Sequence, residues 1–258
     1  MKSYIKNIVV LVVTIIIAVI ASMDFLSMHK NEEIAHNPSI TEIKMLSQYS
    51  PRLKGTSLDT EVYFFDSGIE GGTFLILGGT HPNETAGLVA ATALIENISV
   101  EEGRVIIIPR TNNSGFTHTS PFDGMQDFFT LTLEDGTERT FRVGNRLTNP
   151  VHQWPDMNYY EGTSGRTIYG TENAEVRNVN RLYYGTEDGV LTEQVCYGIY
   201  NLINEENVSI TMDMHEGSPE FLYLDCTMVN MKRDNTTAMS IASDMALSMN
   251  FDDLDMRA

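Results

Sequence analysis

Short runs of apolar residues, separated by one stretch of helical length, constrain the fold of this chain more than any other feature. Three such runs lie at Val62–Phe65, Thr73–Leu77 and Val105–Ile108, each bounded by Gly, Asn or Pro. Continuous apolar runs of this length are typical of strands that are buried on both faces. Residues 84–97, between the second and third runs, are rich in Ala and Leu and long enough for a helix. The sequence therefore predicts a βαβ unit.

The downstream pattern extends this α/β reading. Apolar residues recur at helical spacing over 190–204, which predicts a second helix, and another strand is expected over 208–212. Residues 116–175 interrupt the alternation and include one predicted hairpin, 128–141, which turns at Glu134-Asp135-Gly136. We expect this excursion to form a long loop over one rim, because irregular excursions from a compact scaffold often shape a cleft.

Length and composition indicate one α/β domain after an N-terminal extension. The chain has 258 residues, 42% of them apolar and 20% charged, which is typical of a globular protein. We expect the domain to occupy residues 56–258. Residues 23–55 are polar and mixed, and they predict a linker with a short helical stretch around 41–48.

The N-terminus predicts a targeting segment over residues 1–22. Lys2 and Lys6 precede an uninterrupted apolar run from Ile8 to Ala21. Its length favours a signal peptide, whereas its apolar flanks would allow an uncleaved membrane anchor. Positive charge on the short N-terminal side places the remainder outside the cytoplasm in both cases. We therefore expect a protein that is secreted or anchored to the membrane by this segment.

Net charge and cysteine content limit the partners and the crosslinks. The formal charge is −18, and a surface this acidic repels nucleic acid and anionic lipid headgroups, which are bound mainly by Lys and Arg. We expect no nucleic-acid partner, and membrane contact only through the N-terminal segment. Cys196 and Cys226 are the only cysteines. One bridge between them and two separate buried thiols are both open.

The stretch GGTHPNETAG, residues 78–87, places His81 and Glu84 between a predicted strand and a predicted helix. His-x-x-Glu spacing alone is common by chance. Here, however, the pair lies at the carboxyl end of a strand, where open α/β sheets hold their ligands. The stretch TMDMHEG, residues 211–217, places His215 after another strand, hence at the same edge if the strands are parallel. Two His and one Glu with an open position are a catalytic zinc arrangement, and Asp213 is a candidate to support a ligand.

The third stretch, RNVNRLYYG, covers residues 177–185 and precedes the second predicted helix. Its Asn180-Arg181 pair sets a neutral donor beside a planar cation that can grip a substrate carboxylate with two hydrogen bonds. A solvent-facing salt bridge of Arg181 is the alternative explanation.

GGTHPNETAG, PRTNNSG (residues 109–115), NVNRLYYG and TMDMHEG, in this order, resemble the motifs of the zinc carboxypeptidase superfamily, most of all its succinylglutamate desuccinylase and aspartoacylase branch. The resemblance spans about residues 60 to 230. It implies a doubly wound, mixed β-sheet, one zinc ion bound by His81, Glu84 and His215, and a substrate carboxylate bound by Asn180 and Arg181.

Two departures from the family pattern concern the turn and the catalytic base. Tyr184 stands where the family usually has Pro. The family's general base is a Glu several dozen residues beyond the last zinc ligand, and no matching Glu occurs in the 43 residues after His215. Glu216 and Glu220 follow His215, and Glu216 is the candidate for the base, although a position beside a zinc ligand is not the family's geometry. We therefore expect a chain that lacks the C-terminal strands, as a truncated gene product would.

The expected activity is zinc-dependent hydrolysis of an amide bond in an N-acyl amino acid or a peptide with a free carboxylate. Zinc would lower the pKa of a bound water, a carboxylate would transfer the proton, and Arg110, Arg166 or Arg177 would stabilise the oxyanion. Because the base is missing, an extracytoplasmic module that binds zinc without turnover is the alternative.

Overall fold

The computed structural model describes residues 2–27, 30–119, 125–154, 160–161, 167–168, 175–217, 228–229 and 236–251. Its α-helices are α1 (Lys2–Ser27), α2 (Thr85–Asn97), α4 (Leu191–Glu205) and α5 (Thr236–Phe251). Its strands are β1 (Glu42–Met45), β2 (Glu61–Asp66), β3 (Thr73–Leu77), β4 (Arg104–Ile108), β5 (Phe128–Thr132), β6 (Glu138–Arg142), β7 (Tyr160–Glu161), β8 (Thr167–Ile168) and β9 (Ile210–Asp213). Short 3₁₀ turns are η1 (Leu46–Gln48), η2 (Pro51–Leu53), η3 (Asn113–Thr117), η5 (Glu175–Arg177) and η6 (Val179–Arg181).

A mixed sheet of five strands in the order β1-β2-β4-β3-β9 forms the centre of the domain. Strands β4, β3 and β9 are parallel to one another, whereas β2 is antiparallel to both β1 and β4. The predicted βαβ unit is confirmed as β3, α2 and β4. Parallel neighbours need such a crossover, because a tight hairpin joins only antiparallel strands.

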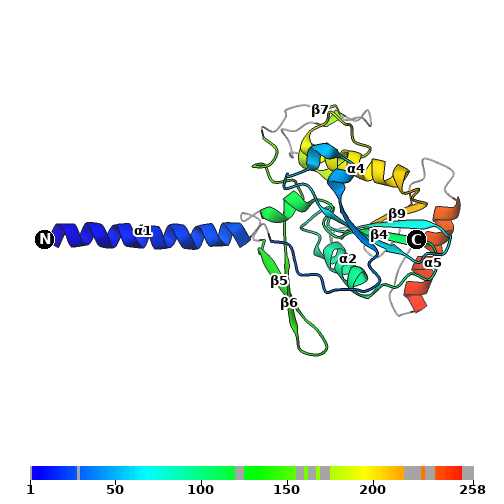
Figure 1. Ribbon diagram of the computed structural model, residues 1–258, viewed down its shortest axis with the longest axis horizontal. Helices are drawn as coiled ribbons and strands as arrows, with labels where there is room; N and C mark the ends of the chain where they lie inside the picture. Colours follow the sequence, from blue (N-terminus) through cyan, green and yellow to red (C-terminus); the bar gives the residue numbers. More distant parts are fainter. Residues whose placement is uncertain are drawn as a thin grey trace.

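Helices cover both faces of this sheet, with α4 on one side and α2 on the other (Figure 1). Successive strand residues alternate between the two cores. Val62 and Phe64 pack in the core that contains α4, and Tyr63 and Phe65 pack in the core that contains α2. Burial on both faces explains why the strands read as continuous apolar runs. The predicted doubly wound α/β arrangement with a mixed sheet is therefore confirmed.

The helical stretch expected around residues 41–48 is wrong. These residues form strand β1, which pairs with β2, followed by the turn η1. Leu46 and Leu53 are completely buried in the core beside α4. Pairing with the free edge of β2 is a tertiary interaction that overrides local helix propensity. Part of the segment interpreted as a linker thus contributes a strand and core side chains to the domain.

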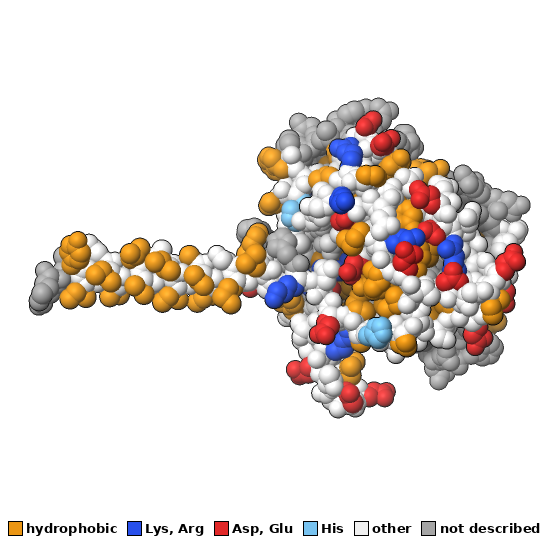
Figure 2. Space-filling model, viewed as in Figure 1, with side chains coloured by type: hydrophobic (Ala, Val, Ile, Leu, Met, Phe, Trp, Pro, Cys, Tyr) orange, Lys and Arg blue, Asp and Glu red, His pale blue; other side chains and the backbone are white. Residues whose placement is uncertain are grey.

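The hairpin predicted within the excursion is confirmed as β5 and β6, with Gly136 in its turn at a positive φ of 81°. Helix α1 projects from the domain as a rod with exposed apolar side chains (Figures 1 and 2). It is long and apolar enough to cross a membrane, and a signal sequence has the same properties.

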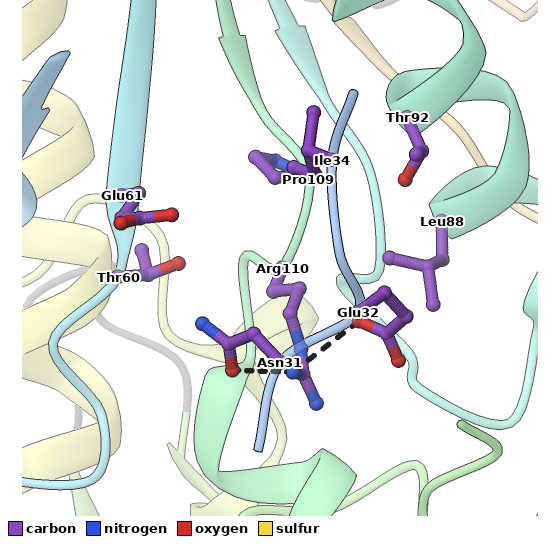
Figure 3. A pocket seen from close by; sticks show the side chains of 9 residues that line it. All are labelled: Asn31, Glu32, Ile34, Thr60, Glu61, Leu88, Thr92, Pro109 and Arg110. Carbon is purple, nitrogen blue, oxygen red and sulfur yellow. Dashed lines mark hydrogen bonds and ion pairs between the residues drawn. The ribbon is translucent and has the colours of Figure 1, made fainter. Parts of the chain in front are cut away.

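Residues 31–37, which follow α1, are tied to the domain by buried polar contacts. Arg110 is 4% exposed, stacks on Phe116, and contacts the side chains of Asn31 and Glu32 (Figure 3). Burial lowers the pKa of Arg110 to about 10, against the opposing charge of Glu32. The amide of Asn37 donates to the carbonyls of Ile95 and Ile98 at the end of α2, at 2.8 and 2.9 Å. The segment is therefore integrated with the core.

Replacement of Asn37 tests this integration. Asn37→Ala leaves two carbonyl acceptors without their donor in a buried place, so we expect the free energy of unfolding to fall by about 2 kcal/mol. Chemical denaturation of the full chain in detergent measures the change. Asn97→Ala is the matched control, because Asn97 is exposed and its amide bonds only within its own helix. Equal free energies of unfolding for the two variants would show that the contacts of residues 31–37 do not stabilise the domain.

Candidate metal centre

Neighbouring parallel strands bring the two histidine stretches together. Strands β3 and β9 pair in register, with Leu77 opposite Asp213. His81 lies four residues after the end of β3, and His215 lies two residues after the end of β9. Both therefore emerge at the same edge of the sheet, as the sequence predicts. Glu84 is the residue that precedes the first turn of α2.

Glycines permit the close backbone packing at this edge. Gly79 has a φ of 59°, in the left-handed region that side chains disfavour, and a Cβ there would lie 2.8 Å from the ring of Phe116. A Cβ on Gly87 would lie 2.8 Å from the carbonyl oxygen of Met214. The turn after β3, the start of α2 and the end of β9 can therefore approach one another closely enough to gather three ligands.

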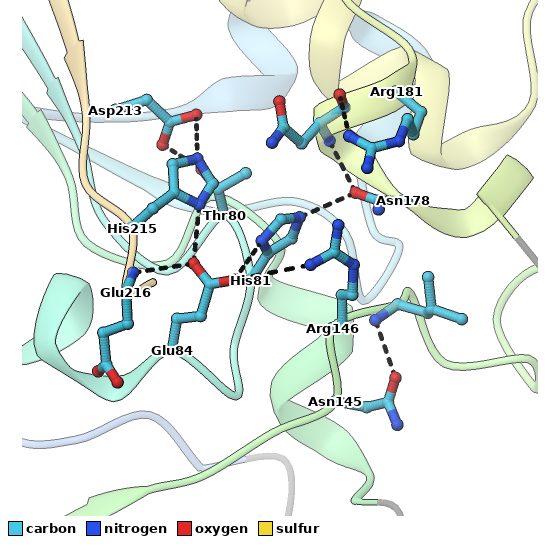
Figure 4. A network of polar contacts seen from close by, with 12 residues as sticks. Thr80, His81, Glu84, Asn145, Arg146, Asn178, Arg181, Asp213, His215 and Glu216 are labelled. Atoms are coloured by element: carbon cyan, nitrogen blue, oxygen red, sulfur yellow. Dashed lines mark hydrogen bonds and ion pairs between the residues drawn. The ribbon is translucent and has the colours of Figure 1, made fainter. Parts of the chain in front are cut away.

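His81, Glu84 and His215 form a single cluster in which the ligand atoms lie within 4.8 Å of one another. The Glu84 carboxylate stands between the two imidazoles, with Oε1 at 2.7 Å from Nδ1 of His81 and Oε2 at 2.8 Å from Nδ1 of His215 (Figure 4). Both Nδ1 atoms thus point to the same carboxylate, and one ion between them could contact all three side chains.

The second nitrogen of each imidazole is held by a polar partner outside the cluster. His81 Nε2 lies 3.0 Å from Oδ1 of Asn178, and His215 Nε2 lies 3.1 Å from Oδ2 of Asp213. Asp213 also accepts a hydrogen bond of 2.7 Å from Thr80. Such partners fix the ring orientation and keep the proton on Nε2. When a metal ion is bound, Nδ1 is therefore the nitrogen of each ring whose lone pair is left to bind it.

The same contacts shift the ionisation of two groups. Burial alone would raise the pKa of Glu84, but the hydrogen bonds and charges of His215 and His81 outweigh it and lower the pKa to about 2. Burial alone would lower the pKa of His215, but Asp213 and Glu84 outweigh it and raise the pKa to about 10. Without metal, the site at neutral pH therefore holds a carboxylate and an imidazolium, and a cation that binds there must displace a proton.

The donor set fits zinc. Two imidazole nitrogens and one carboxylate oxygen, with a further position open, are the ligands that catalytic zinc takes. Hard cations such as Mg²⁺ and Ca²⁺ prefer a shell of oxygens. The partners on both Nε2 atoms complete a metal site of this type.

Asn180 and Arg181 lie in the turn η6, next to Asn178 in the chain. Arg181 is 28% exposed in its side chain, and its Nε donates to Oε2 of Glu175 at 2.9 Å. Because Asn178 contacts His81, this turn is joined directly to the metal cluster (Figure 4). Arg181 therefore forms a salt bridge, as the alternative explanation expects. Binding of a substrate carboxylate by the same side chain stays a prediction.

Arg146 is a cation of the site that the sequence interpretation missed. Its Nη1 lies 3.7 Å from Glu84 Oε1, and its Nε lies 4.0 Å from Glu175 Oε1. The backbone of the excursion places it there, because the amide of Gly144 donates to the carbonyl of Pro82, inside the His81–Glu84 turn. Arg is scarce in this acidic chain, which makes any arginine a candidate for the site. Scarcity alone, however, does not distinguish Arg146 from the other arginines.

The remaining candidates make other contacts or lie outside the described residues. Arg177 is buried and donates from Nη1 to the carbonyl of Thr148 at 2.6 Å, and Arg110 contacts residues 31 and 32. The Glu216 carboxylate accepts from the amide of Ala86 in the first turn of α2 and points away from the imidazoles (Figure 4). Arg166, Glu220 and Cys226 lie outside the described residues. Cys196 is a free, buried thiol.

Comparisons with protein-family models and with curated proteins give no match. Among solved structures, the chain is similar to an aspartoacylase family protein from Mesorhizobium loti, at 18% identity and a TM-score of 0.44 over 83% of this chain and 54% of the other. It is also similar to a succinylglutamate desuccinylase from Silicibacter sp. TM1040, at 16% identity and a TM-score of 0.40 over 74% and 42%. A third similar structure is bovine thrombin-activatable fibrinolysis inhibitor, at 15% identity and a TM-score of 0.44 over 85% of this chain and 68% of the other.

The chain spans about half the length of the first two structures, 54% for the aspartoacylase family protein and 42% for the succinylglutamate desuccinylase.

Removal of a ligand tests the cluster as a metal site. We expect the wild-type chain to bind one equivalent of Zn²⁺, and His81→Ala and His215→Ala to lose at least about 100-fold in affinity, because each removes one of three protein ligands. Titration calorimetry of the metal-free proteins measures both. His36→Ala, which alters an exposed histidine outside the cluster, is the control. Equal affinity of all four proteins would rule out this site.

Proposed function

We propose that the chain is a zinc-dependent hydrolase of an amide bond in an N-acyl amino acid or peptide with a free carboxylate. The observation that carries the proposal is the convergence of His81, Glu84 and His215, with Arg146 and Arg181 beside them. A metal site next to two cations suits a substrate that offers a carbonyl to the metal and an anion to an arginine.

Zinc held by His81, Glu84 and His215 would supply a water of lowered pKa and polarise the scissile carbonyl. Residues of the chain would position the ligands, stabilise charge and bind the substrate. Asn178 and Asp213 hold the two imidazoles in place. Arg146 lies closest to the metal ligands of the two arginines and suits the negative charge that develops on the carbonyl oxygen. Asn180 and Arg181 bind the substrate carboxylate and set its distance from the metal.

A binding module without turnover is the second candidate, and the position of Glu216 favours it. A general base needs a carboxylate within reach of the water that it deprotonates. In the described part of the chain, the acidic side chains near the cluster already have partners. Glu84 contacts the two imidazoles, Glu175 bonds to Arg181 and Asn178, and Glu216 accepts from the start of α2. The metal and carboxylate sites would remain functional in such a module.

We further propose that α1 is the targeting segment or anchor and that the domain lies outside the cytoplasm. The length and apolar surface of α1 support an anchor. The short connection from Ser27 to the tied residues 31–37 would then hold the domain near the bilayer.

Arg181→Ala tests the carboxylate grip. With N-acetyl amino acids as substrates we expect kcat/KM to fall roughly 100-fold, because a charge-assisted interaction with the carboxylate is lost. With the corresponding C-terminal amides we expect a change of less than about threefold, because that interaction is absent from the start. Arg52→Ala, an exposed arginine that bonds to backbone carbonyls, is the control. Equal losses on acids and amides would contradict the assignment.

Turnover by the zinc-loaded full chain separates the two functions. A panel of N-acyl amino acids and dipeptides is incubated with wild type and with Arg146→Ala, and the released amine is measured. We expect zinc-dependent release by wild type, and a fall in kcat of roughly 100-fold for Arg146→Ala with unchanged zinc affinity, because a transition-state interaction is lost. Zinc binding without release from any member of the panel would favour the binding module.

A further inference from the structure

One carboxylate oxygen joins the metal-binding half of the site to the half that carries Arg181. Oε2 of Glu175 accepts a hydrogen bond from Nε of Arg181 at 2.9 Å and another from Nδ2 of Asn178 at 2.9 Å. Asn178 in turn faces Nε2 of His81 with its Oδ1 at 3.0 Å. A continuous path therefore runs from a metal ligand through an amide and a carboxylate to the candidate substrate arginine.

Glu175 helps to determine which way the Asn178 amide faces. The Oδ1 atom of this buried side chain also accepts from the backbone amide of Asn180 at 3.0 Å. If the amide were reversed, Nδ2 would face the N–H of Asn180 and Oδ1 would face the Glu175 carboxylate, and both contacts would be repulsive. The observed orientation presents only an acceptor to Nε2 of His81, so Nε2 carries a proton, and Nδ1 is the nitrogen that a metal ion would use.

Glu175 also orients Arg181 without covering the end of its guanidinium. The contact uses Nε, and one N–H of Nη1 donates to the carbonyl of Asn180 at 3.2 Å. Within the described residues the other three N–H groups have no protein partner. Among the described residues, most of the Nη1 and Nη2 end of the fork is therefore left to bind a carboxylate. The other oxygen of Glu175 lies 4.0 Å from Nε of Arg146 and faces the second cation of the site.

We propose that Glu175 is a positioning residue that aligns the substrate arginine with the metal ligand His81. It would do so through two hydrogen bonds that meet at one oxygen, and its role toward substrate rests on the proposed function. A carboxylate beside Arg181 could instead compete with the substrate for that cation. The structure favours positioning, because the contact at Nε leaves the end of the guanidinium open.

Glu175→Ala, Glu175→Gln and the control Glu187→Ala are compared as full chains. Glutamine retains an oxygen that can accept from both Asn178 and Arg181, whereas alanine retains none. Glu187 has an exposed side chain in the next loop. We expect the zinc dissociation constant, measured by competition with a chromogenic chelator, to rise roughly tenfold for Glu175→Ala, and glutamine to restore most of the affinity.

Substrate selection provides the second measurement. The ratio of kcat/KM for an N-acetyl amino acid to that for its C-terminal amide reports how well Arg181 meets the carboxylate. We expect the ratio to fall at least about fivefold for Glu175→Ala and to recover largely for Glu175→Gln. The double variant Glu175→Ala/Arg181→Ala should match Arg181→Ala alone, because both changes act through one group.

Exchange of the His81 Nε2 proton is the third measurement, and it needs neither zinc nor turnover. Nitrogen-15 NMR of the metal-free protein should show slow exchange with solvent for wild type and Glu175→Gln. We expect exchange at least about tenfold faster for Glu175→Ala, because the amide that holds this proton has lost its anchor. A wild type that bound no zinc would refute the proposed function, while this measurement would still decide the role of Glu175.

Three results would overturn the proposal. These are unchanged zinc affinity and proton exchange in Glu175→Ala, a glutamine variant no better than the alanine variant, or a higher acid-to-amide ratio in Glu175→Ala. The last result would identify Glu175 as a competitor for Arg181.

Discussion

The parallel pairing of β3 with β9 is the constraint on which the site depends. In this register Leu77 faces Asp213, so the loops that carry His81 and His215 leave the sheet side by side. A slip of β9 by one residue would turn the side chain of Asp213 to the other face of the sheet and shift His215 relative to His81. The crossover through α2 enforces the parallel direction of β3 and β4, and it places Glu84 at the start of the same helix.

Around this edge the polar groups form one connected system. Glu84 lies between two imidazoles, and each imidazole is held from behind by Asn178 or Asp213. Buried polar groups are costly unless each finds a partner, and a fully partnered network is rigid. The three candidate metal ligands are therefore held in position by contacts within the protein. What the cation must replace is the proton on Nδ1 of His215, which faces Glu84.

Much of this architecture could be predicted from local pattern, and the rest depends on contacts between distant segments. The strands β2, β3, β4 and β9 and the helices α2 and α4 are encoded by apolar runs and helical periodicity, and the ligand trio follows from their order. Strand β1 escaped prediction, because its conformation comes from pairing with β2. Arg146 and Glu175 escaped it as well. Arg146 lies within the long excursion and Glu175 at its end, and the docking of Gly144 on Pro82 brings Arg146 to the cluster.

The proposed binding of a carboxylate substrate by so acidic a protein presents an apparent conflict, which the scale of electrostatic screening resolves. The formal charge of −18 would repel an anion if all charges acted together. At physiological ionic strength, however, exposed charges are screened beyond about 8 Å, so the groups that line the site dominate. There Arg146 and Arg181 face Glu84 and Glu175, and the local protein charge is close to balanced. A divalent cation would make it positive. Under the proposed function, an anionic substrate would therefore bind more strongly after a metal ion is held by His81, Glu84 and His215.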